Sequence, residues 1–237
     1  EWKVEVPKEY QSWLKAEALS ETELKVTTTT TNNLMVNRVG HIIMKTKEVI
    51  DGFDGITFDI SQGTAFWKEG GADNYVVDEE TGYMTLYGSG IVTNYLFKKG
   101  RLAFDFESIN LTGEDWIEFN MWPNSGNTNF HLHFYANKES NFTCGGSGLN
   151  WTQKTFTWTS EQTNVVKKIE FLVVNKEEGS NALVLKLIID GVEVAVLDNN
   201  ITDPYATEPG APVYFRMHTT NKASNFTVKS ITWEPVE

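Results

Sequence analysis

The sequence predicts an all-β protein: an antiparallel two-sheet β-sandwich of the jelly-roll type, preceded by a short helical or irregular N-terminal extension. Two observations carry this prediction. From about residue 52 onward, short runs of β-branched and aromatic residues follow one another, separated by glycine or charged turns. No helical pattern of ten or more residues occurs after residue 50, so the crossover helices that join parallel strands are not expected.

The first 50 residues differ from the rest. After Pro7, the spacing of Tyr10, Trp13 and Leu14 is typical of a short amphipathic helix over residues 8–19. The threonine-rich run 27–33 has no core pattern and suits an edge strand or a linker. We therefore expect residues 1–50 to form an extension that packs on a sandwich domain of residues 51–237.

The expected strands of the sandwich share high β-propensity and turn residues at their ends. They are 56–60, 83–88, 91–97, 101–106, the two halves of 115–135, 155–159, 167–175, 182–198, 212–219 and 226–234. Within 182–198, Asp190-Gly191 is a strong two-residue hairpin signal.

Composition and charge limit the partners. The chain has 237 residues, a formal charge of -12 and a pI near 4.8, which argues against nucleic acid and anionic membrane surfaces. A neutral glycan fits this charge better than an anionic polysaccharide. A single cysteine excludes an internal disulfide framework, and no stretch is long and apolar enough to span a bilayer.

Residues 115–135 predict the central hairpin of the molecule. Both halves alternate strictly, and residues 123–128 between them are dense in turn formers. The apolar face is expected in the core and consists of Ile117, Phe119, Met121, Phe130, Leu132 and Phe134.

The opposite face of this hairpin is unusually aromatic and polar. A symmetric turn pairs Trp116 with Tyr135, Glu118 with His133, Asn120 with His131, and Trp122 with Asn129. Indole and phenol rings beside hydrogen-bonding groups are suited to the faces and hydroxyls of sugar rings. The side chains expected to bind a glycan are Trp116, Glu118, Asn120, Trp122, Asn124, Asn127, Asn129, His131, His133 and Tyr135.

Several segments together resemble the concanavalin A-like lectin and glucanase sandwich. They are YGSG (87–90), KKGRLAFDFE (98–107), KLIIDGVEVAVL (186–197) and APVYFRMHTTNKASNFTVKSITW (211–233). The resemblance covers roughly residues 52–237. It implies two curved antiparallel sheets whose concave side often holds carbohydrate.

Among members of that group, the chain looks most like non-catalytic carbohydrate-binding modules of bacterial gut polysaccharide degraders. This implies an extracellular or cell-surface module that belongs with other domains of a larger protein. The expected ligand is a neutral polysaccharide, with starch-type α-glucan narrowly favoured over β-glucan. No cofactor is expected to be required.

Two other functions compete with glycan binding. A glycoside hydrolase of the glucanase type needs paired carboxylates at a fixed separation. Asp105 and Glu107 share a face but lack the third acid and the neighbouring tryptophan of the glucanase motif, while Asp115 and Glu118 point to opposite faces. A protein-binding adhesion domain is the other alternative, because an exposed aromatic patch also suits a protein partner.

Metal binding and simple packing are further alternatives. His131 and His133 lie two apart on one strand with Glu118 opposite, so they could form a zinc site. A catalytic zinc generally needs a third histidine or an acid at fixed reach plus an open position, and only Glu118 can be placed there. The alternative is a pair of hydrogen-bonding histidines in a polar groove. Structural calcium is an option at loop acids, namely Asp51, Asp54, Asp73, Asp78, Glu79, Glu80, Asp198 and Asp203. The aromatic face would be packing alone if residues 10–14 covered it.

Overall fold

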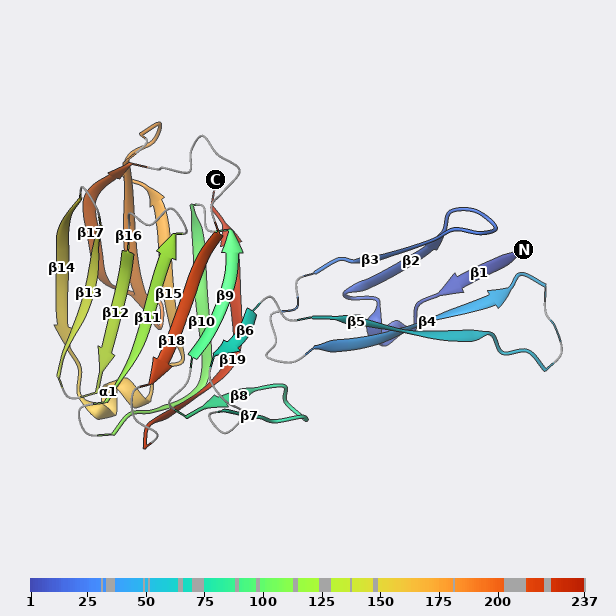
Figure 1. The fold of residues 1–237 in the computed structure, drawn as a ribbon, viewed down its shortest axis with the longest axis horizontal. Helices are drawn as coiled ribbons and strands as arrows, with labels where there is room; N and C mark the ends of the chain where they lie inside the picture. The colour runs from blue at the N-terminus through green and yellow to red at the C-terminus, as the bar shows by residue number, and fades with distance from the viewer. Residues whose placement is uncertain are drawn as a thin grey trace. The chain divides into compact units, whose positions relative to one another are not determined.

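The computed structural model describes residues 1–30, 32, 37–48, 50, 52–63, 66–69, 75–87, 90–96, 99–112, 115–123, 129–136, 138–146, 149–180, 182–202, 212–219 and 223–236. The chain forms two compact units, Glu1–Thr64 and Ala65–Glu237 (Figure 1). The boundary lies after Thr64 rather than after residue 50, because the strand expected to open the sandwich at residues 56–60 pairs within the first unit. No helix among the described residues is both long and apolar enough to cross a membrane.

The N-terminal unit is built from two small antiparallel sheets. A three-stranded sheet has the order β1-β4-β5, and β2 and β3 form a hairpin. The bounds are β1 Trp2–Glu5, β2 Leu14–Ala18, β3 Leu24–Thr28, β4 Arg38–Thr46 and β5 Ile56–Gln62.

The helix expected over residues 8–19 is replaced by a short turn and a strand. A 3-10 helix covers Lys8–Tyr10, and the N–H of Trp13 donates to the Tyr10 carbonyl. Leu14 then begins β2, which pairs with β3. The helix-like spacing of Tyr10, Trp13 and Leu14 instead points these side chains at one small core.

That small core belongs to the N-terminal unit itself. Trp13, Leu14 and Ile42 are buried there, and the Arg38 guanidinium lies 4.5 Å from the centre of the Trp13 ring. At Gly40 a Cβ atom would lie 2.7 Å from Trp13, so only glycine fits beneath the indole.

The second unit is a sandwich of two seven-stranded sheets. The β10 sheet has the order β17-β16-β15-β10-β19-β8-β7, and the β11 sheet has the order β14-β13-β12-β11-β18-β9-β6. All recorded neighbours are antiparallel, as expected, and β18 and β19 lie in the interior of their sheets. Figure 1 shows the β11 sheet in front of the β10 sheet.

The sandwich strands have the following bounds. They are β6 Phe66–Glu69, β7 Tyr75–Val77, β8 Met84–Leu86, β9 Gly90–Leu96, β10 Gly100–Asn110, β11 Trp116–Pro123, β12 Asn129–Tyr135, β13 Glu139–Gly146, β14 Leu149–Thr157, β15 Lys168–Asn175, β16 Ala182–Ile189, β17 Val192–Thr202, β18 Pro212–Thr219 and β19 Asn225–Pro235. One short helix, α1 Ser160–Asn164, begins with a capping box formed by Thr159 and Gln162.

A cluster of phenylalanines joins the two sheets. Phe104 and Phe171 come from the β10 sheet, and Phe119 and Phe142 come from the β11 sheet. All four are at most 1% exposed, and the Phe171 ring centre lies 6.2, 5.5 and 6.1 Å from those of Phe104, Phe119 and Phe142. Of these four, Phe119 lies in the core as the alternating pattern of the central hairpin predicts.

The Asp190-Gly191 hairpin is confirmed. Both residues have positive φ, 47° and 81°, which a two-residue type I′ turn requires. The Asp190 carboxylate also accepts the backbone N–H groups of Lys167 and Lys168, at 3.0 and 2.7 Å. This turn sets the pairs next to it, Ile189 with Val192 and Ile188 with Glu193, before the register of β16 against β17 shifts at Leu187.

Candidate functional site

The central hairpin has the predicted register. Trp116 lies opposite Tyr135, Glu118 opposite His133, and Asn120 opposite His131. The alternate residues Ile117, Phe119, Leu132 and Phe134 are at most 1% exposed and fill the core. The strict alternation therefore places the aromatic and polar residues on the outer face of the β11 sheet.

Three rings gather on that face. The Trp116 ring centre lies 5.3 Å from that of Tyr135 and 6.2 Å from that of His133. His133 and Tyr135 meet edge to face at 6.4 Å, and the Lys138 ammonium lies 5.4 Å from the Tyr135 ring centre. All three rings are half-buried, so each keeps part of its surface open to solvent.

A carboxylate completes this ring cluster. Glu118 Oε1 lies 3.8 Å from His133 Nε2, and the Glu118 side chain is 18% exposed. The indole N–H of Trp116 is buried and has no acceptor among the described residues. A buried donor without an acceptor, in a ring that lies beside two further rings, is the arrangement that a small polar ligand, or a bound water, would satisfy.

The face continues onto strands that sequence reasoning did not assign to the site. Asn141 on β13 lies opposite His133, and Thr155 on β14 lies opposite Asn141. Gln153 Nε2 donates to Asn141 Oδ1 at 2.6 Å, which fixes the orientation of both amides. The available signal was the alternation of the polar residues Asn141 and Thr143 around the apolar Phe142.

The neighbouring strand on the other side is β18. Its register places His218 opposite Glu118, Arg216 opposite Asn120, and Tyr214 opposite Trp122. These positions were not predicted to belong to the site, because the pairing of β18 with β11 joins residues about 100 apart in the sequence.

Six of the predicted site residues have side chains outside the described residues. Trp122 lies in β11, and Asn129 and His131 lie in β12. The side chains of Asn120, Trp122, Asn129 and His131, together with the whole of Asn124 and Asn127, lie outside the described residues. Their assignment to the site stays a prediction.

The apolar residues proposed as a cover for the aromatic face pack elsewhere. Trp13 is 7% exposed and Leu14 is 1% exposed within the core of the N-terminal unit. The reason for expecting Trp116 and Tyr135 to be covered by residues 10–14 is thereby removed.

The acids considered for hydrolysis do not gather around Glu118. Asp105 and Glu107 lie on β10, in the other sheet, where Asp105 accepts a hydrogen bond from Ser230 and Glu107 pairs with Lys229 at 3.3 Å. Glu107 raises the pKa of Lys229 through this contact. Asp115 accepts a hydrogen bond from the buried Ser224 at 2.5 Å.

No group of three His, Cys, Asp or Glu side chains within the described residues could hold a metal ion. His131, one of the three proposed zinc ligands, lies outside this set. Among the loop acids, Asp78 accepts the N–H groups of Glu80 and Thr81, both at 2.9 Å, and Asp198 pairs with Lys176 at 2.8 Å. The bonds from Thr81 and Glu80 lower the pKa of the Asp78 carboxyl.

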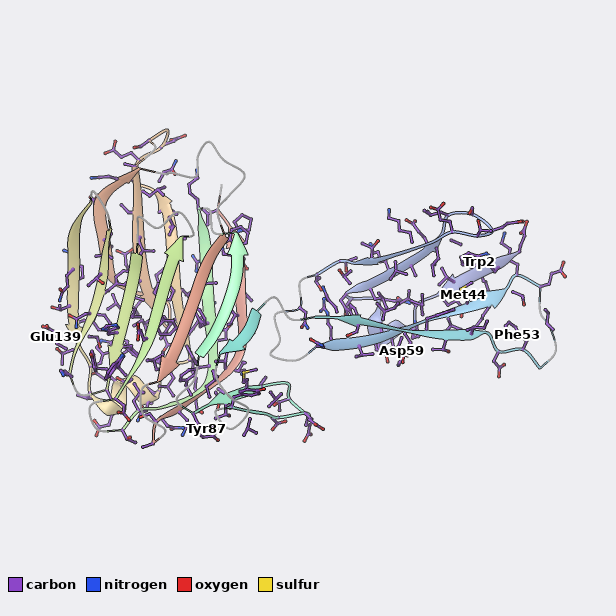
Figure 2. All side chains as sticks on the ribbon, in the orientation of Figure 1. Trp2, Met44, Phe53, Asp59, Tyr87 and Glu139 are labelled. Carbon is purple, nitrogen blue, oxygen red and sulfur yellow. The ribbon has the colours of Figure 1, made fainter. Side chains whose placement is uncertain are left out.

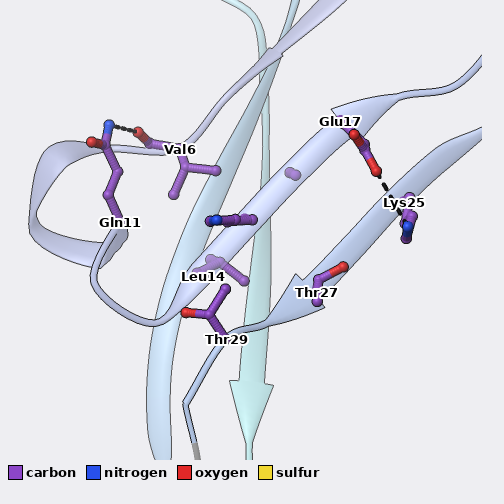
Figure 3. A pocket seen from close by; sticks show the side chains of 9 residues that line it. Val6, Gln11, Leu14, Glu17, Lys25, Thr27 and Thr29 are labelled. Atoms are coloured by element: carbon purple, nitrogen blue, oxygen red, sulfur yellow. Dashed lines mark hydrogen bonds and ion pairs between the residues drawn. The ribbon is translucent and has the colours of Figure 1, made fainter.

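The N-terminal unit has an open cavity of its own, about 670 Å³ in volume (Figure 3). Leu14 lies on its floor, Gln11 donates to the Val6 carbonyl at 2.8 Å on one side, and Glu17 pairs with Lys25 at 3.4 Å on the other. Both members of this ion pair are more than half exposed, so they form a solvated rim.

Two solved structures share the architecture of the second unit. A β-glucanase of Bacillus licheniformis superposes with a TM-score of 0.50 at 12% identity, covering 73% of this chain and 92% of its own. A legume lectin-like domain of Entamoeba histolytica also gives 0.50, at 10% identity, covering 73% and 91%. The fold is the concanavalin A-like β-sandwich. No protein-family model and no curated protein matches the sequence.

Proposed function

We propose that the sandwich unit binds a neutral polysaccharide on the outer face of β11 and β12 and does not cleave it. The observation that carries this proposal is the half-buried ring cluster of Trp116, His133 and Tyr135 beside Glu118. Rings that are partly open can stack on the apolar faces of sugars, while the carboxylate and imidazole hydrogen-bond to hydroxyl groups.

The chemistry of the adjoining strands supports an uncharged ligand. Asn141, Thr143, Gln153 and Thr155 form a patch of amides and hydroxyls without a charged group among them. The outer face of the β10 sheet has the opposite character, since ion pairs such as Arg101–Glu170 and Lys186–Glu193, both at 2.8 Å, cross it. These four neutral residues adjoin the ring cluster through Asn141, which lies opposite His133, whereas ion pairs cross the outer face of the other sheet.

The distribution of acids supports binding without cleavage. Hydrolysis requires a second carboxylate roughly 5 to 9.5 Å from the first. Asp105 and Glu107 lie in the other sheet, and Asp115 is engaged by Ser224. Glu139 begins β13, two strands away from Glu118.

The remaining parts of the proposal rest on the resemblance noted in the sequence. We propose an extracellular or cell-surface bacterial module that acts beside other domains of a larger protein. Starch-type α-glucan is narrowly favoured over β-glucan. Calcium would act as structural support and not as part of the binding site.

Affinity electrophoresis tests the proposal. The intact chain is run through gels containing amylopectin, pullulan, xyloglucan, mixed-linkage glucan or mannan, and retardation by at least one of these glycans is expected. Tyr135→Ala should weaken the affinity for the glycan, calculated from the retardation, about tenfold or more. Truncating a central aromatic contact commonly costs over 1 kcal/mol of binding free energy.

Tyr83→Ala is the matched control. Tyr83 also has a lysine ammonium over its ring, Lys229 at 5.3 Å, but it precedes β8 in the other sheet. Its variant should migrate like the wild type. Absence of retardation in every gel, or an equal loss in both variants, contradicts the proposal.

Glycoside hydrolysis is the second candidate, because a glucanase is among the proteins with this fold. Glu118 is the carboxylate to test for it, because it lies beside His133 of the ring cluster. Reducing-sugar release from the same glycans, lost in Glu118→Gln, would make the protein an enzyme. We expect no release above the blank.

A further inference from the structure

The outer edge of β5 in the N-terminal unit is an open hydrogen-bonding edge. The N–H of Lys47 donates to the Glu1 carbonyl, so β1 bonds to β4 at Lys47 and then at every second residue, Lys45 and Ile43. The alternate residues of β4 must therefore bond to β5. They face Ile56, Phe58 and Ile60.

It follows that the backbone groups of Thr57, Asp59 and Ser61 point away from β4. None of these groups has a hydrogen-bond partner among the described residues. The sheet order β1-β4-β5 places β5 at the edge, so three donors and three acceptors form a row that can receive another strand.

An exposed apolar surface accompanies this edge. Phe58 lies opposite Ile42, which is 1% exposed in the core of the unit, so Phe58 is on the core-facing side of the sheet. Even so, Phe58 is 43% exposed and Ile56 is 53% exposed. Large apolar side chains at alternate positions next to an open edge are what an added strand covers.

The edge has little of the usual protection against pairing. Proteins commonly guard such strands with charged side chains, above all lysine, with proline or with a bulge. The sequence ITFDISQ of β5 has no lysine or proline, and its register with β4 runs without a bulge. Asp59 is the one charged residue in it, and its carboxylate meets His41 Nδ1 at 2.6 Å (Figure 2 labels Asp59).

We propose that β5 binds an extended polypeptide segment that adds to the sheet as a further strand. The segment would carry apolar residues at alternate positions, to cover Ile56 and Phe58, and a basic residue opposite Asp59. This site belongs to the N-terminal unit, and it is independent of the glycan-binding face.

Charge favours such a segment over a second copy of the chain. If two β5 strands paired antiparallel with full overlap, Asp59 would lie directly opposite its own equivalent, and like charges in that position are destabilising. The chain as a whole carries a formal charge of -12, which adds to the repulsion. A lysine or arginine at that position instead forms an opposite-charge pair.

Amide hydrogen exchange measured by NMR on the intact chain tests the proposal. The probe is an acetylated and amidated peptide of sequence VTVKVTV, which alternates as required and reads the same in both directions. On its addition, exchange at Thr57, Asp59 and Ser61 should slow, while Phe58 and Ile60, already bonded to β4, should change little. A peptide N-methylated at the lysine lacks the central donor and should bind about tenfold more weakly.

Two variants of Asp59 separate the contribution of the backbone N–H to peptide binding from that of the carboxylate charge. Asp59→Pro removes an N–H that points away from β4, so it should leave the sheet intact and reduce peptide affinity about tenfold or more. Unchanged amide signals of Gly40 and Ile42 check that the sheet is intact. Asp59→Asn keeps the edge and should lose only the preference for lysine over norleucine in the peptide.

Three results would overturn the proposal. One is exchange at Thr57, Asp59 and Ser61 that stays fast at millimolar peptide. Another is an N-methylated peptide that binds with the same affinity as the unmethylated one. The third is self-association of the chain, detected by sedimentation and abolished by Asp59→Pro, which would make a second copy the occupant of the edge.

Discussion

Replacing Phe171 tests whether the two sheets are held together as described. Phe171 on β15 is fully buried and contacts Phe104 in its own sheet, and Phe119 and Phe142 in the β11 sheet. Phe119 and Phe142 alternate with Glu118 and Asn141, so the same ring supports the sheet that carries the candidate site. Phe171→Ala should therefore destabilise the sandwich and also loosen the site.

The expected loss of stability in Phe171→Ala follows from the packing around the ring. Removing a fully buried phenylalanine costs about 3 to 5 kcal/mol in transfer and cavity terms. We expect a value near the upper end, about 4 to 5 kcal/mol, because three aromatic neighbours surround Phe171 and cannot all move into the space. For a unit of this size, that corresponds to a fall in Tm of roughly 10 to 20 °C.

Urea unfolding followed by near-ultraviolet circular dichroism measures the change. The control is Val192→Ala, since Val192 is 65% exposed and its loss should cost about 0.5 kcal/mol or less. A loss below about 1 kcal/mol for Phe171→Ala would refute the description of the core, because it would mean that the ring is not enclosed between two sheets.

Two further predictions concern polar contacts. Ser224→Ala removes the buried hydroxyl that donates to Asp115 and accepts the Thr112 N–H at 3.1 Å. Urea unfolding should show that the free energy of unfolding falls by about 1 to 3 kcal/mol. A fall within experimental error would contradict the buried hydrogen bond. Asp78 should titrate below its ordinary pKa of 3.8, because Thr81 and Glu80 stabilise the carboxylate. The contribution of Asp78 to stability is then complete above pH 3.8 and is lost as the pH falls through the lowered pKa of the folded state. An NMR titration of the Asp78 carboxyl with a midpoint above pH 3.8 would contradict this.

The sequence predicted local structure well where one pattern determined it. Strict alternation on both sides of a turn left one register for residues 115–135, and the pairs of Trp116 with Tyr135 and Glu118 with His133 were confirmed. The Asp190-Gly191 turn was equally well determined, since few other residues tolerate positive φ at both positions.

Prediction failed where the choice depended on distant partners. Residues 56–60 read correctly as a strand, but alternation does not say which sheet a strand joins, and it joined β4. The spacing of Tyr10, Trp13 and Leu14 satisfies a helix, yet a 3-10 turn followed by β2 brings the same residues to one core. Asn141 joined the candidate site through the pairing of β13 with β12, which its own sequence does not reveal.

The order of strands has a consequence for how the protein is made. The last two strands, β18 and β19, lie between β11 and β9 and between β10 and β8, so neither sheet of the sandwich is continuous without them. A nascent chain that has emerged only as far as β17 exposes unpaired edges in both sheets, and folding must wait for residues 212–235. Removing these two strands should take away the middle of the sandwich and not its margin. The protein should therefore be most prone to aggregate during synthesis, before β18 and β19 have emerged.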